Sequence, residues 1–140
     1  MTRAAPLRAR EARPYNRFVH QNVASSLTAA LSGHGDVVAA YLFGSVARGE
    51  AGPGSDVDVG VLMAASAGAT RVTLASLRGD LQEELQRAAG RPVDLVILNH
   101  AAPDLVHRVL RDGVLLVERD RQARVRFEVR ARNEYFDLLP

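Results

Sequence analysis

The stretch from Phe43 to Asp58 constrains the fold of this chain more than any other part of the sequence. It follows a short apolar run, Val37–Phe43, which has the composition of a buried strand. The stretch is rich in glycine and contains a proline, which predicts a loop with at most one helical turn. Acidic and aliphatic residues then alternate from Asp56 to Met63, which is the period of a strand with its acids on one face. We therefore expect two strands joined by a glycine-rich loop.

The rest of the chain predicts further helices and strands in alternation. Helices are expected where apolar residues recur at helical spacing, over residues 14–31, 70–89, 103–112 and 119–138. Strands are expected over the short apolar runs, at residues 92–98 and 114–117. The order is helix, strand, strand, helix, strand, helix, strand, helix. It predicts an α/β (α+β) fold with one small mixed sheet of about four strands flanked by helices.

Length and composition limit the class of protein. A chain of 140 residues suits one ordinary domain, and we expect it over residues 14–140, with 119–138 as its C-terminal helix. Absence of cysteine excludes disulfides and thiolate metal sites. No apolar run approaches the roughly 20 residues that a membrane span needs, and the N-terminus lacks the apolar core of a secretory signal. We expect a cytoplasmic protein with no membrane partner.

The basic residues are unevenly placed. Residues 1–17 hold five arginines and one glutamate, although the net charge of the whole chain is only +2. We expect residues 1–13 to form a flexible basic arm. Such an arm is either a solvated terminus or a contact for nucleic acid or an acidic partner, and direct nucleic-acid binding stays open.

The glycine-rich loop has the features of a phosphate site. Gly44 allows the backbone to turn tightly and to approach a ligand closely. Ser45 opens a helical turn whose hydroxyl and free amides favour an anion. Arg48 lies on the same loop, where it either guides a triphosphate or is simply exposed.

Three aspartates suggest a metal site beside that loop. Asp56 and Asp58 share one face of a strand, where their mutual repulsion favours a cation between them. Asp94 interrupts the apolar run at 92–98, which we expect to be a central strand, and a charge there is costly unless it is paired or metal-bound. Hard oxygen ligands suit Mg²⁺, with Mn²⁺ as the alternative, and two such ions can clamp a phosphoryl displacement. Asp94 would also act as the base toward an acceptor hydroxyl.

The motif resembles that of a known superfamily. Gly44-Ser45, then ten residues, then Asp56-Val57-Asp58 is similar to the signature of the DNA polymerase β-like nucleotidyltransferases. The fuller string, with Arg48-Gly49 and Ser55 before Asp56, resembles the minimal nucleotidyltransferase (MNT) branch, and Asp94 falls where that family places its third acid. The resemblance covers about residues 37–118. It implies a polymerase β-like fold, with ATP and two Mg²⁺ ions at Gly44, Ser45, Arg48 and the three aspartates.

The tail at 133–140 also resembles MNT antitoxins, which pair with HEPN ribonuclease toxins. Relatives of this kind adenylylate a tyrosine of the toxin, so the resemblance implies an antitoxin that moves AMP from ATP to a HEPN partner. Two other functions stay open. One is a small-molecule transferase of the aminoglycoside type, although those usually carry an extra helical domain. The other is a catalytically silent antitoxin that only sequesters its partner.

Overall fold

A computed structural model describes residues 14–50, 52, 54–65 and 71–140 of the chain. The expected basic arm at 1–13 lies outside the described residues. The elements in chain order are α2 (Pro14–Leu31), β1 (Val37–Phe43), α3 (Gly44–Ala47), β2 (Val57–Met63), α4 (Arg71–Ala89), β3 (Val93–Ile97), the 3₁₀ helix η1 (Leu98–His100), α5 (Pro103–Asp112), β4 (Val114–Glu118) and α6 (Arg121–Asp137). The predicted mixed α/β fold is confirmed.

The four strands form one sheet in the order β3-β2-β1-β4. β1 is antiparallel to both of its neighbours, whereas β2 and β3 are parallel. A parallel pair needs a crossover connection, which the long helix α4 supplies. All eight predicted helices and strands fall within two residues of their predicted bounds, because glycine and proline interrupt the apolar patterns between them.

The expectation that β3 is a central strand is wrong, because β3 lies at the edge of the sheet. Side chains of α4 take up its outer backbone groups. Arg78 donates to Leu95 O at 2.7 Å and Gln82 donates to Val93 O at 3.0 Å. Gln86 Oε1 accepts from Val93 N–H at 3.2 Å. β3 can therefore have an apolar sequence although it is an edge strand, because α4 covers that edge.

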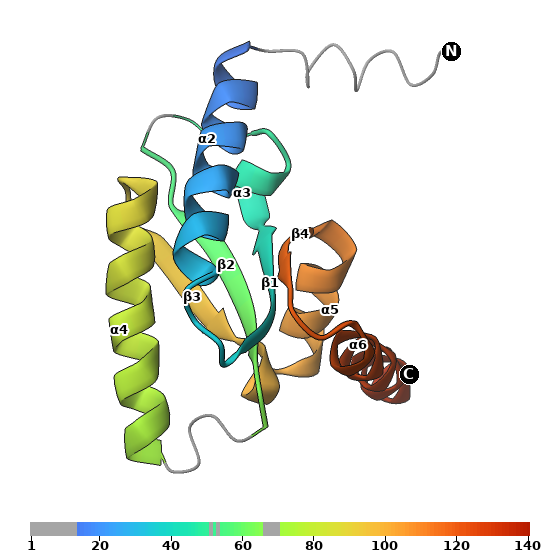
Figure 1. Ribbon diagram of the computed structural model, residues 1–140. Coiled ribbons are helices and arrows are strands. Elements are labelled where there is room, and N and C mark those ends of the chain that lie inside the picture. Colours follow the sequence, from blue (N-terminus) through green and yellow to red (C-terminus); the bar gives the residue numbers. More distant parts are fainter. Residues whose placement is uncertain (1–13, 51, 53, 66–70) are drawn as a thin grey trace.

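Helices cover both faces of the sheet. α2 and α4 lie on one face, and α5 and α6 lie on the other (Figure 1). The α2/α4 face is closed by fully buried leucines of the two helices, among them Leu27 and Leu85, packed on valines of β2. The α5/α6 face has its own core, in which Val109 and Phe127 meet Tyr41 and Leu62. Within the described residues, no helix is both long and apolar enough to cross a membrane.

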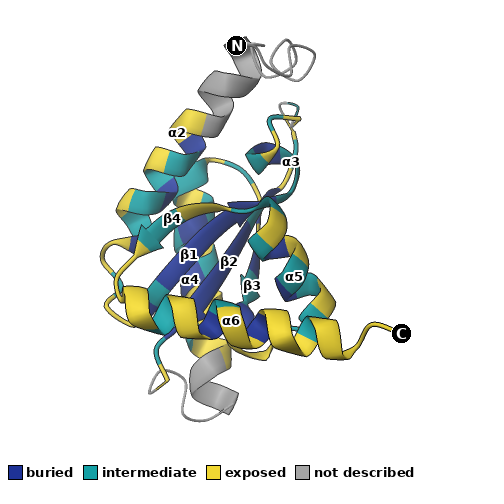
Figure 2. Ribbon diagram, turned by 90° about the vertical axis from the view of Figure 1, so that its right-hand side faces the viewer, coloured by how far each residue is buried: buried dark blue, intermediate teal, exposed yellow. Residues whose placement is uncertain are grey.

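The helix α6 crosses the sheet on its outer side and is largely exposed (Figure 2). It is tied to the sheet by a polar network. The Tyr41 hydroxyl donates to Glu128 Oε2 at 2.6 Å, and Arg124 donates to the same carboxylate at 2.7 Å. Arg124 also donates to Glu118 at the end of β4 at 2.5 Å. The network holds α6 against β1 and β4. The other end of this face lies next to α3 and α5.

Candidate active site

Asp58 lies at the centre of the predicted site. Because side chains alternate along β2, Val57 and Val59 are buried on the α2/α4 face and Asp58 projects from the opposite face. The register pairs Asp58 with Phe43 on β1 and with Asp94 on β3. Register partners project from the same face of a sheet. The fold therefore sets the carboxylates of Asp58 and Asp94 side by side, with Asp58 half-buried and Asp94 exposed.

Gly44 directly adjoins the Asp58 carboxylate. Its φ is +75°, a backbone conformation that favours glycine. A Cβ atom at this position would stand only 2.1 Å from Asp58 Oδ2. Both the turn and the close approach to Asp58 therefore require glycine here. The sequence predicts the tight turn, whereas the approach that it predicts is to a ligand, and that role of Gly44 stays a prediction.

The turn after Gly44 is the short helix α3. The Arg48 N–H donates to Gly44 O at 3.1 Å, and the Glu50 N–H donates to Ser45 O at 2.9 Å. Amides in the first turn of a helix have no acceptor within that helix, so those at 45–47 are the candidate anion donors. The turn begins at the end of β1, next to Asp58. A phosphate cradle at Ser45 and an acidic cluster at Asp58 are thus neighbours, and phosphate binding there stays a prediction.

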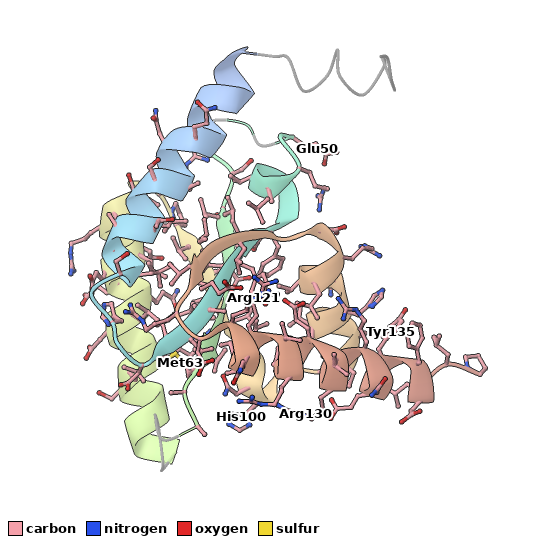
Figure 3. The ribbon with its side chains drawn as sticks, turned by 45° about the vertical axis from the view of Figure 1, so that its right-hand side comes forward. Glu50, Met63, His100, Arg121, Arg130 and Tyr135 are labelled. Atoms are coloured by element: carbon pink, nitrogen blue, oxygen red, sulfur yellow. The ribbon has the colours of Figure 1, made fainter. Side chains whose placement is uncertain are left out.

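Arg48 lies near the aspartates, but its side chain is bonded to Glu50. Its Nε donates to Glu50 Oε1 at 2.9 Å, and the two side chains are 45% and 54% exposed. Figure 3 places Glu50 on the loop that follows α3. The charge of Arg48 still acts on Asp58. Arg48 is therefore near enough to meet a triphosphate at α3, although that role stays a prediction.

The other two aspartates both act on the pKa of Asp58. Partial burial raises the pKa of its carboxyl, and the negative charges of Asp94 and then Asp56 raise it further. Arg48 and Arg108 act in the opposite direction. A divalent cation between these carboxylates would relieve their repulsion, so the donors suit Mg²⁺ or Mn²⁺ chemically. As the described side chains lie, no three acids or histidines are grouped to hold a metal ion, and the metal site stays a prediction.

Arg108 on α5 is a charged neighbour that the sequence reasoning missed. Its charge acts on both Asp58 and Asp112. It directly precedes Val109, which packs over the face of β2 near Gly60, at 3.4 Å from an added Cβ there. No motif marks this arginine. Only the packing of α5 onto the sheet brings it to the acids.

A family model described as polymerase beta, nucleotidyltransferase matches residues 25–122. The match spans more than half of the chain and contains all three aspartates. The chain therefore belongs to the polymerase beta nucleotidyltransferase family. Among curated proteins, none matches this chain.

The solved structures that are similar to this chain indicate the MNT branch of the family. A chain of a toxin–antitoxin complex with AMP-PNP is 28% identical, with a TM-score of 0.68 over 82% of this chain and 88% of that chain. A chain of the toxin–antitoxin complex MntA–HepT is 27% identical, with a TM-score of 0.63 over 84% and 88%. A chain of the complex of tri-AMPylated Shewanella oneidensis HEPN toxin with MNT antitoxin is 27% identical, with a TM-score of 0.64 over 85% and 88%. The resemblance to MNT antitoxins is confirmed.

Proposed function

We propose that this chain transfers AMP from ATP to a hydroxyl of a HEPN toxin and thereby neutralises it. The observation that carries the proposal is the contact of Gly44 with Asp58, beside the register pairing of Asp58 with Asp94. It joins the predicted phosphate turn to the predicted metal ligands in one small volume. The similar solved structures add support. One is a toxin–antitoxin complex with AMP-PNP, and another is a complex of an AMPylated HEPN toxin with its MNT antitoxin.

Each residue has a defined task in this reaction. The turn at Ser45, with Arg48 beside it, holds the triphosphate. Asp56, Asp58 and Asp94 would hold the Mg²⁺ ions, which supply positive charge to the α-phosphate and to the leaving pyrophosphate. The acceptor oxygen forms a bond to the α-phosphorus, the bond from that phosphorus to the bridging oxygen breaks, and pyrophosphate leaves. Asp94 takes the proton of the acceptor hydroxyl.

The exposed side of α6 is the surface that we assign to the toxin. It presents Val125, Val129 and Phe136, which are 41%, 49% and 58% exposed. Val125 and Val129 line a shallow groove of about 460 Å³ together with two arginines and two acids, Arg126, Arg130, Glu134 and Asp137. Large exposed apolar side chains beside charges of both signs favour a protein partner that offers an apolar surface with polar groups around it. We therefore assign docking of the partner to α6, at a distance from the three aspartates.

The test is transfer of labelled AMP from ATP, with Mg²⁺, to a HEPN protein that co-purifies with the chain. Asp56→Asn together with Asp58→Asn should lower the rate by several orders of magnitude, since each lost electrostatic contribution costs about 10²–10³. The matched control is Asp36→Asn with Asp80→Asn, which removes the same charge from exposed positions outside the acidic cluster. That control should transfer AMP at the wild-type rate. Mass spectrometry identifies the modified side chain, and tyrosine is expected from the family resemblance.

Toxin binding should survive in the Asp56→Asn, Asp58→Asn variant, because the α6 surface lies away from the acids. Equal neutralisation by wild type and variant, with no AMP on the toxin, would instead establish a silent sequestering antitoxin. Transfer of AMP to an aminoglycoside and not to the protein would establish the small-molecule transferase.

A further inference from the structure

The turn that joins α4 to β3 lies against the loop that leads into β2. α4 ends at Ala89, and Gly90 follows with a φ of +70°, a left-handed conformation that glycine adopts without strain. The Gly90 N–H donates to Gln86 O at 2.9 Å and closes the helix. The chain then enters β3 at the same end of the sheet as α3 (Figure 1). This places residues 91 and 92 next to residues 55–57.

Two hydrogen bonds from this turn lie on either side of Asp56. Arg91 Nη1 donates to Ser55 O at 3.2 Å, and the Val57 N–H donates to Pro92 O at 3.0 Å. Ser55 O belongs to the peptide group before Asp56, and Val57 N belongs to the peptide group after it. A residue has only two soft backbone torsions, and both lie between these two peptide groups. The two bonds therefore fix the backbone of Asp56, and with it the direction of its Cα–Cβ bond.

Asp56 depends on such bonds more than the other two aspartates do. Asp58 and Asp94 lie within β2 and β3, and the ladder between these strands pairs them directly. Asp56 is exposed and precedes the first residue of β2. It shares a face with Asp58 only if the extended backbone of the strand continues back to residue 56. The bonds from residues 91 and 92 extend the strand in this way.

The loop before Asp56 has hydrogen bonds of its own. The Gly52 N–H donates to Ser55 Oγ at 2.9 Å, and the Ser55 N–H donates to Gly52 O at 3.2 Å. These bonds shape the turn at 52–55 but do not involve the carbonyl group of Ser55. The half-buried Arg91 side chain bonds that carbonyl group. Arg91 thus connects the end of the glycine-rich loop to the start of β3.

We propose that Arg91 is a positioning residue for Asp56, and that its bond to Ser55 O holds the Asp56 carboxylate on the same side of the sheet as Asp58 and Asp94, in place for a divalent cation. This inference rests on the proposed function, because it concerns the cation that the reaction needs. Arg91 acts through the backbone and needs no contact with the nucleotide or the acceptor. Loss of a residue that orients a metal ligand typically lowers metal affinity or activity by about 10–100-fold.

The affinity for Mn²⁺ alone, without nucleotide, tests this role, because positioning and simple charge predict opposite signs. Removal of a cation near carboxylates strengthens the binding of a metal ion by charge alone, whereas removal of a positioning bond weakens it. We expect Arg91→Ala to raise the Kd for Mn²⁺, measured by electron paramagnetic resonance, by about 10–100-fold. Arg91→Lys keeps the charge and a donor and should recover part of that affinity. In the AMP-transfer assay, the Mg²⁺ concentration at half-maximal rate should rise in the same order.

Arg119 provides the matched control. Its guanidinium donates to the backbone carbonyls of Ser32, His34 and Val37 at 3.0, 3.2 and 3.1 Å. Val37 lies at the opposite end of β1 from Phe43, the register partner of Asp58. Arg119→Ala therefore removes bonds of the same kind far from the aspartates. It should lower the urea midpoint at least as much as Arg91→Ala does, but it should leave the Kd for Mn²⁺ unchanged.

A Kd of Arg91→Ala that equals the wild-type value or lies below it would overturn the inference, and so would an equal rise in Arg119→Ala. The binding measurement needs no acceptor, so it separates this inference from the proposed function. If Mn²⁺ binding changes as expected but the wild type transfers AMP to no protein, the proposed function fails and the role of Arg91 is supported. If the wild type binds no Mn²⁺, the role of Arg91 is overturned together with the predicted metal site.

Discussion

The two faces of the sheet differ in what their strands contribute. On the α2/α4 face, the inward residues of β2 and β3 are all apolar. Those from Val57 to Leu95 are at most 4% exposed, and Ile97 packs partly buried against them. On the α5/α6 face, the same two strands present Asp58, Gly60 and Asp94. One face is thus an uninterrupted core. The other is a core only where α5 and α6 cover it.

This difference follows from the period of a strand. Alternate residues point to opposite faces, so β2 supplies Val57 and Val59 to one face and Asp58 to the other. The apolar face anchors the strand, which allows its other face to carry charges that repel each other. We therefore expect substitutions on the α2/α4 face to change stability, and those at the acidic end to change chemistry.

The largest loss of stability is expected on the apolar face. Leu27 of α2 has no exposed surface and packs in the α2/α4 core. Leu27→Ala should lower the free energy of unfolding by about 2–5 kcal/mol, as usual for a buried leucine. Urea unfolding measures the loss. AMP transfer, assayed well below the new unfolding midpoint, should stay near the wild-type rate, and a large fall in kcat with folded protein would contradict the division between the faces.

A smaller loss of stability and a larger loss of rate are expected at Gly44. In Gly44→Ala the new methyl meets Asp58 Oδ2 at 2.1 Å, so the carboxylate must move away. The left-handed backbone adds about 1–2 kcal/mol of strain, and displacement of Asp58 should lower AMP transfer by roughly 100-fold.

Gly49 provides the matched control for that substitution. Its φ is +73°, close to that of Gly44, but an added Cβ meets nothing within 4 Å. Gly49→Ala should therefore show a similar loss in thermal unfolding while keeping most of the transfer rate. Equal rates for the two alanine variants would show that the contact with Asp58 does not matter to the reaction.

Much of this fold could be predicted from the sequence because its signals are local. The helix expected at 14–31 matches α2, and the short apolar runs match the four strands. The edge position of β3 could not be predicted, since an apolar run fits a central strand equally well. An apolar strand is compatible with the edge position only because side chains of another element, α4, bond its outer backbone groups.

The candidate site also has one part that the sequence predicts and one part that it does not. The spacing of Gly44, Asp56 and Asp58 is carried by one continuous segment, so the motif alone suggests their proximity. Asp94 was expected beside them, and the parallel register sets it next to Asp58. The position of Arg108 depends on how α5 packs onto the sheet, and no local sequence pattern indicates that packing. Long-range packing is the part that the sequence reasoning missed.

The smallest effect is expected at Tyr41, where the covered end of the α5/α6 face depends on a polar contact. Tyr41 is 4% exposed and its hydroxyl donates to Glu128 at 2.6 Å. Tyr41→Phe should lower the free energy of unfolding at neutral pH by about 1 kcal/mol, the usual contribution of one hydrogen bond. Burial, and then the Glu128 carboxylate, raises the pKa of Tyr41 well above its ordinary value of 10.0.

The pH dependence tests the same contact with a definite sign. Above about pH 10, Tyr41 of the unfolded chain loses its proton whereas the folded chain keeps it. Because the folded state then binds more protons, the stability of the wild type falls as the pH rises. The phenylalanine variant lacks this group, so the advantage of the wild type should be full below pH 10 and should shrink above it. Urea midpoints of both proteins from pH 7 to pH 11.5 measure the difference. A constant gap across that range would mean that the Tyr41 hydroxyl is no better protected in the folded chain than in the unfolded one, and that the α5/α6 face is held by its apolar contacts alone.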